Sequence, residues 1–145
     1  MYKHILVPID GSKLSAKAIK TAVSLAGELR AKVTLFYVAP DYGGVYYAES
    51  ALLATQYTAK SFRATVDKHA KKLLEQAARQ AGAAVETRYV ISEFPHDAIV
   101  RAAAKNKCDL IVMASHGRRG ISGFLLGSET HKVLTHSKVP VLVVR

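Results

Sequence analysis

Two kinds of segment alternate along the chain, and this alternation restricts the possible folds more than any other feature. Five short apolar runs, most of them rich in β-branched residues, occupy residues 5–9, 33–38, 85–91, 110–113 and 139–144. Between them, apolar residues recur every three or four positions over residues 14–29, 62–81 and 98–103, and a fourth helical pattern begins at Glu129. The order predicts an α/β fold with an open, mostly parallel five-stranded sheet and helices on both faces.

Local signals agree with these boundaries. Ser12 is placed to cap the first helix, Gly82 to end the second and Pro95 to begin the third. Ser128 is the expected N-cap of the last helix. Most runs are continuously apolar, as expected of strands buried on both faces, but residues 85–91 alternate and therefore indicate an edge strand.

Length and composition predict one globular domain over residues 1–145, with 50% hydrophobic residues to form its core. No apolar run is long enough to cross a bilayer, and residues 1–10 do not resemble a signal peptide. The single cysteine, Cys108, suits a reducing compartment, so we expect a cytoplasmic protein without membrane contact. The net charge of +10 is interpreted as solvated helix faces; attraction to polyanions is a minor alternative, and nucleic acid is not an expected partner because no recognised motif is present.

A glycine-rich loop over residues 114–128 connects the fourth apolar run to the last helical pattern. Glycines let the main chain approach a ligand closely, and the free N–H groups at a helix start attract anions. Arg118 and Arg119 lie inside the loop and could pair with phosphate oxygens. We therefore predict that this loop holds the phosphates of a nucleotide.

A second loop, Asp10-Gly-Ser12, follows the first apolar run. If the first and fourth strands are neighbours, Asp10 faces the glycine-rich loop across the crevice where such sheets bind ligands. Its carboxylate could accept hydrogen bonds from ribose hydroxyls, while Pro8, Val38 and Met113 could line a slot for the base. The full set of candidate nucleotide-binding residues is Pro8, Asp10, Val38, Met113, Ala114, His116, Gly117, Arg118, Arg119, Gly127, Ser128 and Glu129.

Other chemistries have little support. The chain has neither a G-x-x-x-x-G-K-[ST] loop nor a G-x-G-x-x-G after the first strand. No G-x-S-x-G elbow surrounds Ser115-His116, so a nucleophile–base pair is not expected there. His131 and His136 lack neighbouring metal ligands in the sequence and are interpreted as surface histidines. No catalytic residue and no protein metal ligand are predicted.

The chain resembles the universal stress protein family along essentially its whole length. Nucleotide-binding members carry a glycine, two residues, a glycine, nine residues, and then glycine followed by serine or threonine. Residues 114–128 match this pattern except that Ala114 replaces the first glycine, and both ends of the chain, Val-Pro-Ile-Asp-Gly-Ser and Val-Pro-Val-Leu-Val-Val, are also similar. A methyl group at Ala114 is costly only if the backbone there needs a positive φ.

The resemblance implies strand order 3-2-1-4-5 and binding of ATP or a related adenine nucleotide, with Mg²⁺ carried by the phosphates. It also implies a homodimer joined through residues 139–144, which form an apolar strand of the kind that seeks a partner. We expect a stress-response or regulatory protein that binds nucleotide, with at most slow ATP hydrolysis. Two alternatives stay open. One is a nucleotide-free interaction module acting through its dimer and the tyrosine-rich segment 40–49. The other is an enzyme on the same scaffold, such as a nucleotidyl transferase or an ATP pyrophosphatase, although the H-x-G-H or S-G-G-x-D-S element that these would need is missing.

Overall fold

The computed structural model describes residues 1–41, 59–117 and 126–145. Its five strands form one parallel sheet in the order β3-β2-β1-β4-β5, which confirms the predicted fold and strand order. The strands are β1 (His4–Ile9), β2 (Lys32–Ala39), β3 (Glu86–Ile91), β4 (Leu110–Ala114) and β5 (Val141–Val144). The alternating run over residues 85–91 is the edge strand β3, as its pattern predicted.

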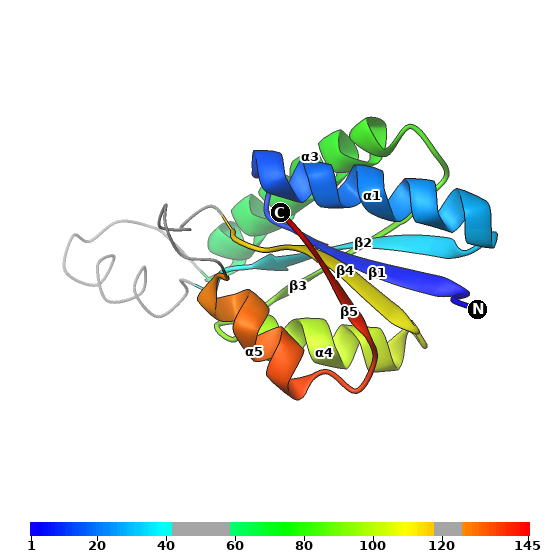
Figure 1. Ribbon diagram of the computed structural model, residues 1–145. Helices are drawn as coiled ribbons and strands as arrows, with labels where there is room; N and C mark the ends of the chain where they lie inside the picture. The colour runs from blue at the N-terminus through cyan, green and yellow to red at the C-terminus, as the bar shows by residue number, and fades with distance from the viewer. Residues whose placement is uncertain (42–58, 118–125) are drawn as a thin grey trace.

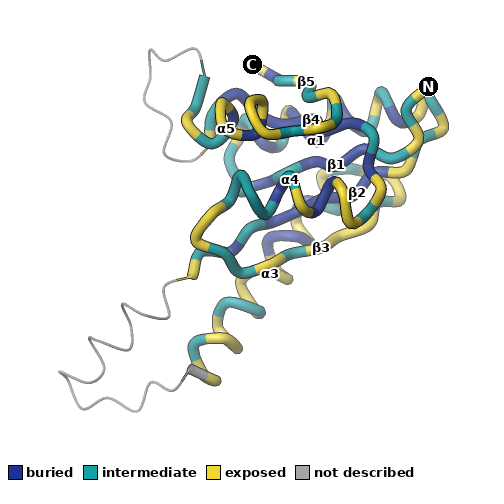
Figure 2. The backbone as a smooth tube through the Cα atoms, turned by 90° about the horizontal axis from the view of Figure 1, so that it is seen from below, coloured by how far each residue is buried: buried dark blue, intermediate teal, exposed yellow. Residues whose placement is uncertain are grey.

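Helices cover both faces of the sheet (Figure 1). On one face lie α1 (Lys13–Leu29) and α3 (Ala59–Ala81), and on the other lie α4 (Pro95–Lys105) and α5 (Ser128–His136). Each face has its own apolar core, one packed around Ile5, Val7 and Leu35 and the other around Leu6, Phe36 and Ile111. Buried residues follow the central strands, and exposed residues follow the outer helix surfaces (Figure 2).

Three of the four predicted helix boundaries are confirmed. The Ser12 hydroxyl accepts the backbone N–H of Ser15 at 3.1 Å, Pro95 is the first residue of α4, and Gly82 follows α3 with φ of +61°. The prediction for Ser128 is wrong, because it is already the first residue of α5 and Gly127 is the N-cap. The extended backbone of Gly127 places its carbonyl to accept the N–H of His131 at 2.9 Å.

The last strand is shorter than the apolar run that predicted it, starting at Val141 rather than at residue 139. Pro140 has no N–H to donate to the ladder, although its carbonyl accepts the N–H of Ile111 at 3.0 Å. The strand ends beside α1, where the Lys17 ammonium donates a hydrogen bond to the carbonyl of Arg145. The N-terminus lies at the start of β1 and the C-terminus at the end of β5, so the two ends of the chain lie at opposite ends of the parallel strands (Figure 1).

One carboxylate joins the starts of β1 and β4. Asp109 accepts the backbone N–H groups of Lys3 at 2.8 Å and His4 at 3.0 Å. Desolvation acts to raise the pKa of Asp109, but these backbone hydrogen bonds outweigh it and hold the pKa below its usual value. Cys108, beside it, is buried, and desolvation raises the pKa of its thiol to about 11.

Helices long and apolar enough to span a membrane do not occur among the described residues.

Candidate functional site

The loops that follow β1 and β4 meet at the carboxyl edge of the sheet, because these two strands are neighbours. A Cβ atom built on Gly117 would lie 2.9 Å from Oδ2 of Asp10, so the carboxylate presses against the bare glycine backbone. The other carboxylate oxygen, Oδ1, accepts the N–H of Ser12 at 2.9 Å. The structure thus brings together the two predicted halves of the site, Asp10 and the start of the glycine-rich loop.

The turn that presents Asp10 depends on a glycine. Gly11 has φ of +80°, a conformation that side-chain-bearing residues rarely adopt. Its α-carbon also faces α3, where a Cβ would lie 3.4 Å from a methyl group of Leu73. The backbone N–H of Asp10 donates to the buried hydroxyl of Ser15 at 3.3 Å. The turn is therefore held to α1 by the hydrogen bond to Ser15, and it packs against α3 at Leu73.

The two ends of the glycine-rich loop are joined to each other. Gly127 donates its N–H to the carbonyl of Ser115 at 2.7 Å. A Cβ on Gly127 would lie 3.1 Å from that carbonyl oxygen and 3.3 Å from Cα of His116, so only glycine allows this approach without displacement. Residues 118–125 lie outside the described residues, and with them the predicted contacts of Arg118 and Arg119.

Ala114, the departure from the family pattern, is the last residue of β4 and pairs with Val144. Positive φ among the described non-glycine residues occurs at Arg30 and Lys107, so Ala114 does not adopt it. The backbone penalty considered for its methyl group is therefore not incurred. The Ala114 carbonyl accepts the buried hydroxyl of Thr130 at 3.0 Å, which ties the first turn of α5 to the end of β4.

The imidazole of His116 lies between Ser115 and Gly127. Its Nδ1 lies 3.0 Å from the hydroxyl of Ser115, and its Cδ2 edge faces Gly127, 3.9 Å from the position of a Cβ there. The buried Nε2 atom has no hydrogen-bond partner within the described residues. Ser115 itself is only 3% exposed, which does not suit a nucleophile. An imidazole nitrogen in this setting is suited to bind a ligand oxygen rather than to activate the serine.

The three residues proposed for the base slot have different surroundings. Met113 is buried and packs in the core on the α4 and α5 face. Val38 is half-buried and packs against the same core, and Pro8 is half-buried in β1, opposite Phe36 of β2. Pro8 and Val38 thus keep part of their surface available at the carboxyl half of the sheet, whereas Met113 contributes mainly to the core.

Glu129 has a role that the sequence did not reveal. Its Oε2 accepts the backbone N–H of His96 at 2.9 Å and lies 3.3 Å from Nδ1 of the same residue, while Lys132 donates to Oε1 at 3.1 Å. Burial acts to raise the pKa of this carboxyl, but the hydrogen bonds from Lys132 and His96 dominate and lower it. Because the N-cap of α4, Phe94, has no capping side chain, Glu129 of α5 satisfies the start of α4 instead.

The side chain of Ser128 stands at the first helical position of α5, next to the N-cap Gly127. Its N–H and that of Glu129 belong to the first turn, where amides lack partners within the helix. The main chain of both residues is therefore placed for an anion, although the carboxylate of Glu129 is directed to α4.

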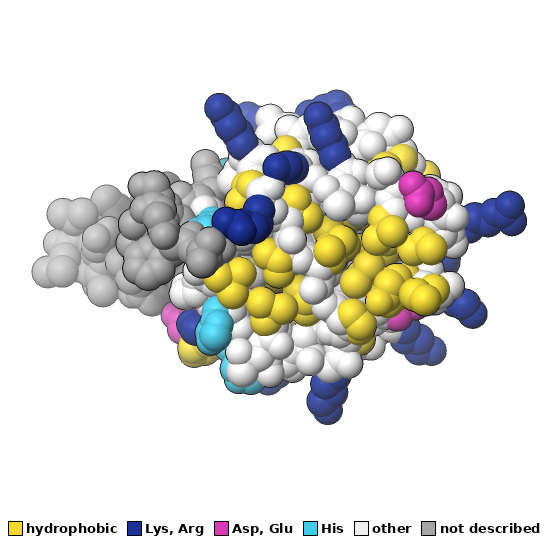
Figure 3. All heavy atoms as spheres, viewed as in Figure 1, with side chains coloured by type: hydrophobic (Ala, Val, Ile, Leu, Met, Phe, Trp, Pro, Cys, Tyr) yellow, Lys and Arg dark blue, Asp and Glu magenta, His cyan; other side chains and the backbone are white. Residues whose placement is uncertain are grey.

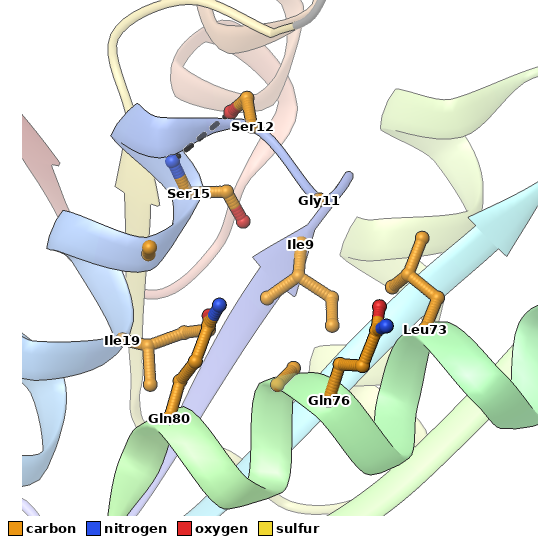
Figure 4. Close-up of a pocket in the computed structure, with 10 residues that line it drawn as sticks. Ile9, Gly11, Ser12, Ser15, Ile19, Leu73, Gln76 and Gln80 are labelled. Atoms are coloured by element: carbon orange, nitrogen blue, oxygen red, sulfur yellow. Dashed lines mark hydrogen bonds between the residues drawn. The ribbon is translucent and has the colours of Figure 1, made fainter.

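A small pocket adjoins the Asp10 turn on the α1 and α3 side (Figure 4). Gln76 and Gln80 of α3 lie across it from Ser15 of α1 and from Ser12, the N-cap of that helix, and Ile9 of β1 lies between them. Its volume of about 50 Å³ is enough for a water molecule or two but not for a nucleotide. Neither Asp10 nor Gly117 lines this pocket, so it is distinct from the place where those two residues meet.

The fold and the meeting of the two loops define a class: an open, doubly wound α/β protein with a glycine-rich loop after its fourth strand. The profile of the universal stress protein family matches residues 1–145, and the chain belongs to this family. Universal stress protein YxiE of Bacillus subtilis is 37% identical over 152 aligned residues, which cover all of both chains.

Solved structures agree. The protein MJ0577 of Methanocaldococcus jannaschii superposes with a TM-score of 0.79 at 30% identity, covering 99% of this chain and 96% of the other. A universal stress protein solved in complex with cAMP superposes with a TM-score of 0.73 at 26% identity, covering 99% and 97%.

Proposed function

We propose that this chain is a stress-response or regulatory protein that binds an adenine nucleotide at the carboxyl edge of β1 and β4. The carrying observation is the 2.9 Å approach between the Gly117 Cβ position and Asp10 Oδ2, which puts a ribose acceptor beside a glycine backbone. The relative solved with cAMP supports an adenine nucleotide as the ligand. The phosphates would lie against the amides at the start of α5, where the helix dipole favours negative charge.

The assignment of roles follows the chemistry of each group. Asp10 would accept the ribose hydroxyls, and Pro8 and Val38 would contact the base. The main chain of Gly117, Gly127 and Ser128 would approach the phosphates, with Mg²⁺ bound through the phosphate oxygens of ATP. Nε2 of His116, buried and without a partner among the described residues, would bond a ligand oxygen. Binding rather than turnover is the proposed activity.

The test is calorimetry of the purified protein with Mg-ATP, ADP, AMP and cAMP, alongside thermal shift. We expect saturable heat with at least one of them and a rise in melting temperature. If none gives heat or a shift at millimolar concentration, nucleotide binding is wrong and the nucleotide-free interaction module remains. In that event Ala114→Gly is measured in the same way. Nucleotide binding by this variant but not by the native chain would show that the methyl group of Ala114 prevents binding, and the native chain would then be the interaction module.

We also propose a homodimer through β5. This strand is at the edge of the sheet, and Leu142 is 41% exposed there. Apolar side chains form a broad patch over this side of the molecule (Figure 3), and an uncovered edge strand with apolar residues favours pairing. Sedimentation should give a dimer for the native chain and a monomer for Leu142→Lys, whereas a native monomer at all concentrations would contradict the proposal.

A further inference from the structure

Two histidines from different helices lie side by side on the α4 and α5 face. The ring centroids of His96, in the first turn of α4, and His136, the last residue of α5, are 5.7 Å apart with planes tilted by 44°. This pair is not apparent from the amino-acid sequence, because the two residues are forty positions apart. Histidine side chains gather beside α5 at the molecular surface (Figure 3).

Each ring has a partner that fixes its protonated nitrogen. Nδ1 of His96 lies 3.3 Å from Oε2 of Glu129, and Nδ1 of His136 lies 2.8 Å from the carbonyl oxygen of Lys132. An ionised carboxylate and a carbonyl can only accept, so in both rings Nδ1 carries the hydrogen. In the neutral ring the lone pair is then on Nε2. Metal-binding histidines commonly show this arrangement, with Nδ1–H donated to a carboxylate or carbonyl and Nε2 left for the metal.

The positions of the partners also indicate where the Nε2 atoms point. Glu129 and His136 are seven residues apart on α5, so they lie on one helix face separated by about 10 Å along the axis. His96 contacts both, which places it between them. Because Nδ1 and Nε2 point in widely different directions from the imidazole, the Nε2 atom of His96 points away from Glu129, and the neighbouring His136 ring lies 5.7 Å from the His96 ring. Nε2 of His136 likewise points away from the backbone of its own helix.

We propose that His96 and His136 bind a divalent transition-metal ion such as Zn²⁺ or Cu²⁺ through their Nε2 atoms, with Glu129 as a positioning residue. Two rings that share a metal at about 2 Å from each nitrogen have centroids 5–6 Å apart, in agreement with the observed separation. No group of three or more His, Cys, Asp or Glu side chains able to hold a metal occurs in the described parts of the chain, so water would fill the remaining positions. His136 is exposed and the His96 side chain is 21% exposed, which leaves room for that water.

The neighbouring charges set the expected strength. Glu129 favours a cation, but the ammonium of Lys132 lies 3.1 Å from its Oε1 and opposes one. On α4, Asp97 is paired with Arg101 at 2.9 Å and adds no net charge. Replacing Lys132 by glutamine is therefore expected to tighten metal binding, whereas a merely structural role for the histidines predicts no change in either direction.

The experiment uses the untagged full chain without nucleotide, so its outcome is independent of the proposed function. Calorimetry with Zn²⁺ should show one site that His96→Gln or His136→Gln weakens at least tenfold, while the matched control His131→Gln, an exposed histidine on the same helix, leaves it unchanged. Glu129→Gln should weaken it about 10- to 100-fold through the orientation of His96. Equal affinity in the native chain and the His96→Gln/His136→Gln double variant, or no Zn²⁺ binding by the native chain, would overturn the proposal.

A second measurement does not depend on any variant folding. Long-range proton–nitrogen NMR spectra of the native chain report which imidazole nitrogen is protonated and which is bound to metal. Without metal, both His96 and His136 should be protonated on Nδ1. On addition of Zn²⁺ the Nε2 resonances of both rings should shift together, and a shift confined to one ring or to other histidines would contradict a shared site.

Discussion

Replacing Gly117 by alanine tests whether the two loops act as one site. The added methyl would lie 2.9 Å from Oδ2 of Asp10, a separation that real Cβ atoms essentially never show. The carboxylate is the end of a side chain and can rotate away, at a cost of about 0.5–1.5 kcal/mol for leaving its rotamer. The free energy of unfolding should therefore fall by about 0.5–1.5 kcal/mol.

The effect on ligand binding should be larger than the effect on stability. A displaced carboxylate no longer accepts the ribose hydroxyls, and hydrogen bonds to a charged group contribute about 1.5–3 kcal/mol. Nucleotide affinity should fall roughly 10- to 150-fold. Isothermal calorimetry with Mg-ATP and urea unfolding would be measured on the same preparations.

The matched control is Gly27→Ala. Gly27 lies inside α1 with no atom within 4 Å of its Cβ position, so alanine should raise stability by about 0.5–1 kcal/mol and leave binding unchanged. Native affinity in Gly117→Ala would refute the reasoning that Asp10 and the loop bind the ligand together. A loss of affinity accompanied by an equal loss of stability would show general disruption instead.

Three further predictions concern the framework. Thr130→Val should lower the free energy of unfolding in urea by about 1–3 kcal/mol, because it removes the buried hydrogen bond to Ala114. The control Thr135→Val removes a similar hydrogen bond at an exposed position and should change that free energy by less than about 0.5 kcal/mol; equal effects of the two variants would contradict the role of burial. The thiol of Cys108, with a pKa raised to about 11, should resist a thiol reagent at pH 8 until urea unfolds the chain, and rapid labelling of the folded protein would be inconsistent with its burial. Because folding lowers the pKa of Asp109, the ionised carboxylate stabilises the folded state at neutral pH, and this stabilisation is lost as the pH falls through the pKa of the folded state. The loss of unfolding free energy caused by Asp109→Ala should therefore shrink on acidification. A loss that does not change with pH would argue against the hydrogen bonds from Lys3 and His4.

The sheet was predictable because its signals are local. Continuous apolar runs identify buried strands, the alternating run of β3 identifies an edge, and Ser12 and Pro95 mark helix starts in their own segments. The exact starts of β5 and α5 were not predictable from local signals. Val139 and Pro140 continue the apolar run although β5 begins at Val141, and Gly127 is the N-cap of α5 although it has no side chain to accept a hydrogen bond.

The candidate site was predictable only in part. The loop chemistry of Asp10 and Gly117 is local, but their meeting depends on β1 and β4 being neighbours, an order that the family resemblance implied; the structure has that order and brings the two residues together. The bond from Glu129 to the start of α4 and the pairing of His96 with His136 depend on how two helices cross over the sheet. The sequence of neither helix indicates how the two helices cross, so His136 was interpreted from the sequence as a surface histidine without a neighbouring metal ligand.

The hydrogen bond from Gly127 to Ser115 has a consequence for how such a protein can diverge. With both ends pinned at one point, the number of residues between them does not alter the register of α5 against β4. Lengthening a closed segment costs little free energy, since the entropic penalty grows only with the logarithm of its length. Insertions between these anchors should therefore be tolerated, and ligand preference can be retuned there while the scaffold stays as it is.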